Sequence, residues 1–404
     1  MKNKKIIGRI SGWLLLGLGI PILFFALLEG LLLLLPINDD IVSSNRFKVG
    51  IPLWAHDQAN FNLASDIYKQ VLNNELPASS VEWLKCFVQA QDIHYKMKPN
   101  LDAWVMNSVN RFELKKGLKV RFKSNSLGFR SAEIAQKKPP GVYRIAFLGD
   151  STVFGWGVQA GERFSDLLAE RLNQRHDGRC YEVLNFAIPG YTSLHGLEVY
   201  RRYALDFSPD MVMVSFGAND GRLVPKAVKQ LLGHRSILQG LKNFLVNFKT
   251  YRLLRKWMFS LYNPFDHLKQ TETQAMEPFI TLDEYCANLQ AIIDENKQRS
   301  IRTVFLSLCS PIDYLAKMSA VAQREGIPEF DGMYVLLQSI AAIQNDPTQK
   351  KNISYYQRLY GPKLLRERRI LYVTSDTCHP NRIGHQVLAD FLYERLFGEG
   401  SSVQ

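Results

Sequence analysis

Short apolar runs alternate with amphipathic stretches over the second half of the chain, and this pattern limits the fold most strongly. The apolar runs lie at 143–148, 182–186, 211–216, 303–308 and 370–373. Helical spacing of apolar residues starts at about Glu162 and Ser193 and covers 282–297, and Asn381 can cap a last helix. Apolar strands separated by helices are typical of a parallel sheet covered on both faces. The sequence therefore predicts a five-stranded parallel sheet.

Polar residues follow the predicted strands where such sheets place their active sites, at the carboxyl ends. In chain order the blocks are Gly149-Asp150-Ser151, Pro189-Gly190, Gly217-Ala218-Asn219-Asp220 and Asp376-Thr377-Cys378-His379. Together they resemble the SGNH (GDSL-type) hydrolases over residues 140–398. The earlier segment Asn125-Ser126-Leu127-Gly128-Phe129-Arg130 is similar to members of this family that carry an N-terminal membrane helix.

The chemistry of these residues fits a serine hydrolase. The hydroxyl of Ser151 needs a base, and imidazole, here His379, is the side chain best suited to that task near neutral pH. Asp376 precedes His379 by one turn and can hold its tautomer and stabilise its protonated form. The resemblance implies an oxyanion hole made by the backbone N–H groups of Ser151 and Gly190 and by the side-chain amide of Asn219.

Each block also has a purely structural interpretation. Ser151 can cap a helix, the sequence after Gly217 can be a simple turn, and His379-Pro380 can be a helix entry. We favour the catalytic interpretation because all the blocks occur together and in order. Asp150 and Asp220 are expected to hold loops rather than to catalyse.

No cofactor or metal is expected. His385 lies near His379 and Asp376 in the sequence, but it sits on a different turn and completes no ligand set.

Residues 10–35 predict a membrane anchor. The segment contains twelve leucines, and only Glu29 carries a charge. A helix of this length can cross a hydrocarbon core of about 30 Å. A cleaved signal peptide fits less well, because the apolar run is long and no small-residue cleavage site follows it. Glu29 can face a partner helix or be a tolerated charge near one end, and we favour the second interpretation.

The charges that flank the anchor predict its orientation. Lys2, Lys4, Lys5 and Arg9 precede it and acidic residues follow it, so residues 1–9 are expected in the cytoplasm and the body outside, in the periplasm of a Gram-negative cell. The expected domains are the anchor at 10–36, an N-terminal extension at 41–138 and a hydrolase domain at 140–404. The expected fold class is α/β, a flavodoxin-like three-layer sandwich preceded by the transmembrane helix and the irregular extension.

The hydrolase domain is expected to contain a basic helical insertion at 222–275. Residues 222–270 hold ten Lys or Arg and one acidic residue, interleaved with apolar side chains. This pattern suits a membrane surface or an anionic polymer, or alternatively a helical cap on the sheet with a solvated basic face. Since the insertion follows Asn219, it is expected to line the substrate cleft.

Five scattered cysteines form neither a disulfide framework nor a zinc site. Most of them are expected to be buried packing residues. A second hypothesis pairs Cys309, which ends a predicted strand, with Cys378, which adjoins His379.

The sequence thus predicts a membrane-anchored serine esterase that cleaves an acyl ester, with acetyl expected, on an extracytoplasmic glycan or lipid. One alternative is an O-acetyltransferase for cell-surface polysaccharide, which would need a membrane partner to deliver acetyl groups. Another is a non-catalytic glycan-binding or assembly protein on a hydrolase scaffold. The net charge of +12 would suit nucleic acid, but no nucleic-acid-binding motif is present.

Overall fold

A computed structural model describes most of the chain. The described residues are 17, 19–39, 41–42, 51–53, 71, 78–90, 94–106, 119–175, 177–225, 241, 244–261, 275–360, 370–372 and 378–398. Asp376 therefore lies outside the described residues.

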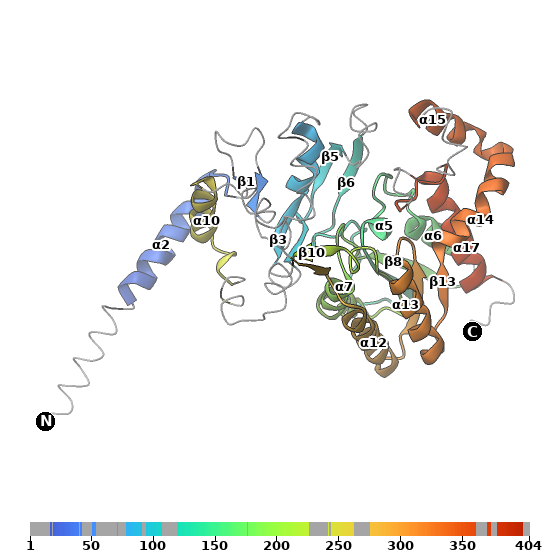
Figure 1. The fold of residues 1–404 in the computed structure, drawn as a ribbon. Helices are drawn as coiled ribbons and strands as arrows, with labels where there is room; N and C mark the ends of the chain where they lie inside the picture. The colour runs from blue at the N-terminus through green and yellow to red at the C-terminus, as the bar shows by residue number, and fades with distance from the viewer. Residues whose placement is uncertain are drawn as a thin grey trace, which may run out of the picture.

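A five-stranded parallel sheet forms the centre of the molecule (Figure 1). Its spatial order is β8-β7-β9-β12-β13, which is the flavodoxin-like order 2-1-3-4-5 along the chain. Every residue of β9 is buried, as expected for a strand with both faces covered. The strands are β7 (Val142–Gly149), β8 (Cys180–Asn185), β9 (Met211–Ser215), β12 (Arg302–Ser307) and β13 (Glu329–Asp331).

The prediction of the fifth strand is wrong in its position. Ile370 and Leu371 lie in a turn, and Tyr372 makes only an isolated antiparallel bridge with Pro380. The fifth strand is instead β13, whose three residues are all half-buried. An edge strand has one open side, so β13 does not need the continuous apolar run that reveals the inner strands.

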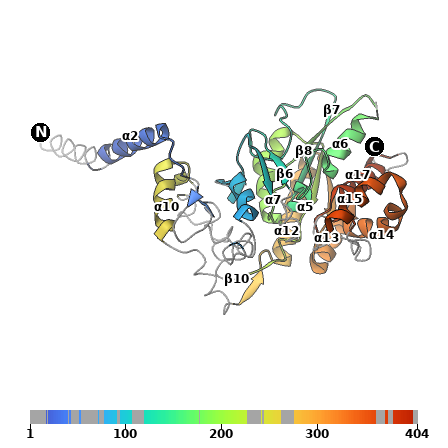
Figure 2. The ribbon, with the colours of Figure 1, turned by 90° about the horizontal axis from the view of Figure 1, so that it is seen from above.

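Helices cover both faces of the sheet, as Figure 2 shows. One layer contains α6, α14 and α17, and the other contains α7, α12 and α13. Thr281 caps α12 through a reciprocal pair of bonds with Glu284, and the Asn381 side chain accepts from two backbone N–H groups of α17. The helices of the domain are α5 (Ser151–Phe154), α6 (Phe164–Asn173), α7 (Ser193–Val199), η4 (Tyr200–Ala204), η5 (Leu205–Phe207), α12 (Leu282–Gln298), α13 (Ile312–Glu325), α14 (Gly332–Asn345), η6 (Pro347–Gln349), α15 (Lys350–Tyr360) and α17 (Arg382–Phe397).

The N-terminal extension contributes small antiparallel pairs beside the sheet (Figure 1). Aromatic side chains from the extension, such as Phe87 and Phe122, belong to the same buried core as those of the sheet. The described part of the extension therefore packs as part of the same body as the sheet. Its elements are β1 (Ile41–Val42), β2 (Ile51–Pro52), η3 (Ala78–Cys86), β3 (Phe87–Ala90), β4 (His94–Met97), β5 (Asp102–Met106) and β6 (Lys119–Lys123).

An arm made of α2 (Ile20–Leu34) and α10 (Lys249–Leu261) projects from the body (Figures 1 and 2). Within the described ranges, no helix is both long enough and apolar enough to cross a bilayer. The insertion that carries α10 starts at β10 (Leu223–Pro225), which pairs with β11 (Met276–Pro278).

The position of α10 bears on two predictions about the insertion, of which residues 226–240, 242–243 and 262–274 lie outside the described residues. This helix packs on α2 and β1 and lies apart from α5, so it neither caps the sheet nor lines the site around Ser151.

Candidate functional site

Ser151 lies at the start of α5, where β7 turns sharply into a short helix. Asp150 forms the N-cap: its Oδ1 accepts from the Thr152 backbone N–H at 2.9 Å and from the Thr152 hydroxyl at 2.8 Å. Gly149 allows the tight turn, because a Cβ at this position would lie 2.4 Å from Cγ2 of Val153. These contacts hold the Ser151 hydroxyl at the carboxyl edge of the sheet.

The imidazole of His379 reaches this hydroxyl from a distant part of the chain. His379 Nε2 lies 2.8 Å from Ser151 Oγ, which is within hydrogen-bonding distance and suits transfer of the hydroxyl proton. Asp376, the residue predicted to orient this imidazole, lies outside the described residues.

Several contacts hold the segment that carries His379. A disulfide joins Cys378 to Cys309, which follows β12, and it confirms the pairing hypothesis. Asn381 donates through Nδ2 to the carbonyl of Ile370 at 2.6 Å and caps α17. His379 therefore lies between a covalent link and a capped helix.

The remaining cysteines only partly match the expectation of burial. Cys86 is buried and Cys286 is half-buried, whereas Cys180 is exposed.

The predicted oxyanion residues converge on Ser151 through Asn219. Its Nδ2 donates to Asp150 Oδ2 at 3.2 Å and to the Tyr191 carbonyl at 3.1 Å, so it lies between the neighbour of Ser151 and the neighbour of Gly190. Gly190 has a φ of +83°, a conformation that favours glycine. Because both N–H groups of the Asn219 amide already bind protein acceptors, one of these bonds must yield when the amide binds an oxyanion.

Asp220 holds two of these loops together, as predicted. Its Oδ1 accepts from the Ser193 backbone N–H at 2.9 Å and from the Ser193 hydroxyl at 2.5 Å, and its Oδ2 accepts from the Gly217 N–H at 3.0 Å. Complete burial raises the pKa of Asp220 to about 7, against the opposing effect of these donors. Burial also raises the pKa of Asp150.

The motif 125–130 has a role that the sequence analysis missed. The buried guanidinium of Arg130 donates to the carbonyls of Phe154 at 3.2 Å and Gly155 at 2.8 Å, at the end of α5. It also donates to the carbonyls of Val158 at 2.8 Å and Arg121 at 3.1 Å. Arg130 thus binds the carboxyl end of the helix whose first residue is Ser151.

The surroundings of Arg130 fix its position, and it remains charged despite its burial. The rings of Phe122 and Phe154 lie 5.2 and 5.1 Å from the guanidinium carbon. Burial, together with the nearby Arg163, lowers the pKa of Arg130 to about 9, which leaves it charged at neutral pH. The turn before it requires Gly128, whose φ is +83°, because a Cβ there would lie 2.3 Å from the Met97 carbonyl oxygen.

The β3–β4 hairpin of the extension holds the Gly190 loop in the same way. The hydroxyl of Tyr95 donates to the Pro189 carbonyl, and the hydroxyl of Tyr191 donates to the Tyr95 carbonyl, both at 2.5 Å. The extension therefore contacts both the helix of Ser151 and the loop of Gly190. A buried tyrosine gives no such signal in a single sequence.

His385 has a structural position. It is completely buried, its ring stacks on Phe164, and its Nδ1 accepts from the Phe164 N–H at 3.2 Å. Burial lowers its pKa to about 3. Across the described part of the chain, no group of three or more His, Cys, Asp or Glu side chains is placed to hold a metal ion.

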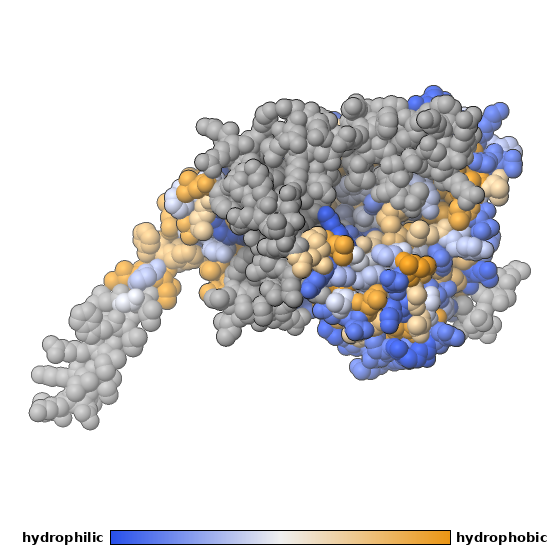
Figure 3. Space-filling model, viewed as in Figure 1, coloured by the Kyte–Doolittle hydropathy of each residue, from blue (hydrophilic) through white to orange (hydrophobic). Residues whose placement is uncertain are grey.

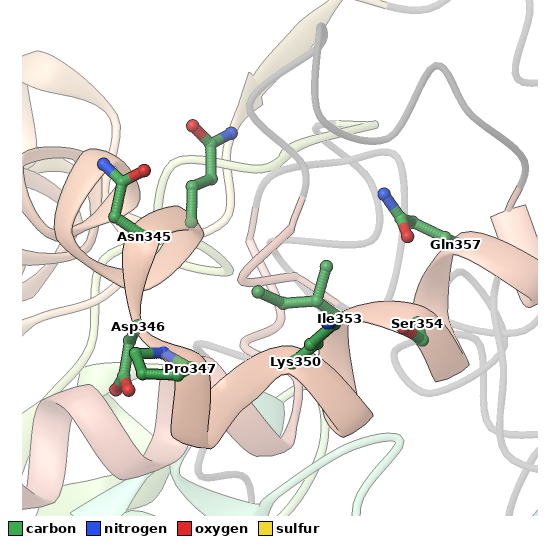
Figure 4. Close-up of a pocket in the computed structure, with 8 residues that line it drawn as sticks. Asn345, Asp346, Pro347, Lys350, Ile353, Ser354 and Gln357 are labelled. Atoms are coloured by element: carbon green, nitrogen blue, oxygen red, sulfur yellow. The ribbon is translucent and has the colours of Figure 1, made fainter.

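A separate hollow lies between the end of α14 and the side of α15. Figure 4 shows Asn345, Asp346, Lys350 and Gln357 around it, and Pro347 and Ile353 are its apolar residues. It shares no residue with the group around Ser151.

Comparisons with known proteins agree with this geometry. The sequence model of the GDSL-like Lipase/Acylhydrolase family matches residues 147–387. A comparison with curated proteins gives no match.

A comparison with solved structures gives matches at low sequence identity and low TM-score. One is a psychrotrophic esterase, EstA, from Pseudoalteromonas sp., with 14% identity, a TM-score of 0.36, and coverage of 62% of this chain and 94% of that one. Another is the lipase/acylhydrolase from Enterococcus faecalis, with 16% identity, a TM-score of 0.35, and coverage of 62% and 93%.

Proposed function

The chain belongs to the GDSL-like lipase/acylhydrolase family and is a serine hydrolase acting on esters, and on this premise we propose that Ser151 and His379 cleave an acyl ester through an acyl-enzyme. The distance of 2.8 Å between Ser151 Oγ and His379 Nε2 carries this proposal. Both atoms lie at the carboxyl edge of a parallel sheet, where such sites form.

In the proposed reaction Ser151 Oγ bonds to the acyl carbon while its proton passes to His379 Nε2. The carbonyl oxygen becomes an oxyanion that the N–H groups of Ser151 and Gly190 and the amide of Asn219 stabilise. The bond to the leaving alkoxide then breaks, and His379 returns the proton to that oxygen. Water repeats the sequence on the acyl-enzyme. Asp376 holds the imidazole in the required tautomer.

We further propose that the substrate is a small acyl ester, with acetyl favoured, on a glycan or lipid outside the cytoplasm. Residues 10–35 anchor the chain in the membrane, and the basic residues that precede them keep the short N-terminus inside. The Cys309–Cys378 disulfide supports this location, because disulfides persist mainly in oxidising compartments. The excess of basic residues suits an anionic carrier or membrane.

Labelling with a fluorophosphonate tests the catalytic proposal. We expect full-length wild-type protein to be labelled at residue 151 and Ser151→Ala to remain unlabelled. Ser310→Ala is the matched control, because its hydroxyl lies in the same group of loops but donates to the Phe216 carbonyl, at 3.1 Å, rather than to an imidazole. Labelling that maps to another residue, or that persists in Ser151→Ala, would refute the assignment.

The acyl group and the fate of the product need a second measurement. We expect p-nitrophenyl acetate to be cleaved faster than the longer butyrate and octanoate esters, with free acetate as the product. A polysaccharide acceptor that becomes acetylated in place of acetate release would instead identify the enzyme as a transferase.

A further inference from the structure

The helix α10 has its polar and apolar faces reversed relative to an ordinary surface helix. Within Lys249–Leu261 the exposed residues are all apolar: Leu254, Trp257, Met258 and Leu261. Their spacing of three, four and seven residues places them on one face. Trp257 is 60% exposed and Leu261 is 62% exposed. Exposure of such an apolar face to water is unfavourable, so we expect an apolar partner to cover it.

The basic side chains of α10 are turned toward the protein. Arg252 pairs with Asp39 at 2.7 Å, and Lys249 Nζ donates to the Leu35 carbonyl at 2.7 Å. Lys256 donates to the Asn38 carbonyl. All three partners lie at the end of α2 or just after it, so these charges fix α10 to the segment that leaves the predicted anchor.

Glu29, the single charge in the predicted anchor, caps the N-terminus of α10. Its Oε1 accepts from the Lys249 N–H at 2.6 Å, and its Oε2 accepts from the Thr250 N–H at 2.9 Å and the Thr250 hydroxyl at 2.6 Å. A carboxylate at a helix N-terminus satisfies unpaired N–H groups and the helix dipole. The interpretation of Glu29 as a tolerated charge is therefore wrong, since Glu29 faces a partner helix of its own chain.

The apolar face of α10 continues the apolar surface of α2. Most residues of α2 are exposed and apolar, and its less exposed side is the one that contacts the α10 segment, with Phe25 and Phe248 rings 5.4 Å apart. Figure 3 shows hydrophobic side chains gathered along the arm formed by these two helices. Whatever covers the surface of α2 is therefore positioned to cover this face as well.

We propose that α10 is a second membrane element, an interfacial helix that lies on the outer side of the bilayer with Leu254, Trp257, Met258 and Leu261 in the lipid. The proposal rests on the membrane anchoring by residues 10–35 proposed above. Tryptophan is favoured where headgroups meet acyl chains, and an amphipathic helix binds there through its apolar face. The bilayer is the favoured occupant because the face is continuous with a segment that has the composition of a membrane span.

Bromine-labelled phospholipid tests the depth of Trp257. Full-length protein is reconstituted in vesicles of phosphatidylcholine and phosphatidylglycerol, with or without bromine on the upper acyl chain. The emission of Trp257 is the difference between wild type and Trp257→Phe. Trp104, on β5, is a matched control because it is 57% exposed. We expect bromine to quench the Trp257 contribution strongly and the Trp104 contribution little.

Three outcomes would overturn the proposal. Equal quenching of Trp257 and Trp104 would place α10 outside the lipid. A Trp257 contribution that is unquenched and depends on the ratio of protein to lipid would show that a second copy of the chain covers the face. Third, Glu29→Leu removes the cap, so trypsin should cut near Lys256 faster than in wild type. Unchanged cleavage would show that Glu29 does not fix α10 beside α2, on which the proposed position of α10 at the bilayer depends.

The same vesicles separate this proposal from the others. If the full-length protein does not float with the vesicles, the proposed membrane anchoring by residues 10–35 is refuted. Loss of ester hydrolysis with flotation and quenching intact would refute only the proposed function.

Discussion

Replacing Arg130 by lysine should slow acylation of Ser151 even though the two side chains do not touch. The guanidinium of Arg130 donates to four backbone carbonyls, including those of Phe154 and Gly155 at the end of α5. Lysine keeps the charge but has a compact group that cannot reproduce this planar fork. If two charge-assisted bonds are lost at about 1.5–3 kcal/mol each, the free energy of unfolding falls by about 3–6 kcal/mol.

The effect on catalysis follows from the position of α5. This helix has only four residues, so a shift of its last carbonyls moves Ser151 as well. A misplacement of about 1 Å can reduce a rate about 100-fold. We therefore expect the rate constant of fluorophosphonate labelling, corrected for the folded fraction, to fall about 100-fold. KM for p-nitrophenyl acetate should change much less than kcat, because Arg130 does not line the site.

Arg144→Lys provides the matched control. Arg144 is also completely buried and also donates to backbone carbonyls, those of Gln136, Phe207 and Ala135, but it lies near the start of β7, at the opposite edge of the sheet. We expect a similar loss of stability with little change in labelling rate. Equal slowing in both variants, or normal labelling in Arg130→Lys, would refute a positioning role for Arg130.

Three further outcomes are expected. Replacing Cys309 and Cys378 by serine should lower the free energy of unfolding by about 4 kcal/mol, since the disulfide closes a loop across 69 residues. It should also lower kcat, because the His379 segment is no longer held. Denaturant unfolding and kinetics, each with and without reductant, check the two effects. Asn219→Ala should lower kcat about 100- to 1000-fold, whereas a loss of stability alone would show that the amide serves only Asp150 and Tyr191. The folded pKa of Asp220, about 7, exceeds its unfolded value, so the free energy of unfolding of wild type should fall as pH rises from about 4 to about 7. Thermal melting of Asp220→Asn over this range should lack the part of this pH dependence that Asp220 contributes.

The inner part of the sheet could be predicted because its strands are buried on both faces. Such strands need uninterrupted apolar residues, as in β7 and β9, and their helices show a clear apolar face. The pattern fails at the edge: β13 is short and half-buried, and the pattern predicts no element between 308 and 370, where α13, α14 and α15 lie. The apolar residues at 370–372 are completely or nearly completely buried, but they pack as a turn under α17.

The site could be predicted where its chemistry depends on residue type, and not where it depends on distant contacts. Ser151 and Asn219 follow the ends of β7 and β9, His379 comes after them in a recognisable order, and the structure brings Ser151 and His379 together. Nothing local shows that the Arg130 guanidinium binds the end of α5, because that contact spans 24–25 residues. Glu29 is a stronger case: its partners lie 220 residues or more away, so its sequence context shows only an unfavourable charge in an apolar segment.

The extension connects the arm to the catalytic loops through successive polar contacts. Arg255 of α10 donates to Gln89 of β3 at 2.6 Å, β3 pairs with β4, and Tyr95 of β4 donates to the Pro189 carbonyl beside Gly190. In the proposed orientation these contacts therefore set the height of the site above the bilayer. A fixed height favours esters held at a constant distance from the membrane, such as those on a lipid-linked carrier or on a polymer lying against the surface. Substitutions at Gln89 that break the connection should then reduce activity on vesicle-bound esters more than activity on a freely diffusing ester, which reaches the site at any height.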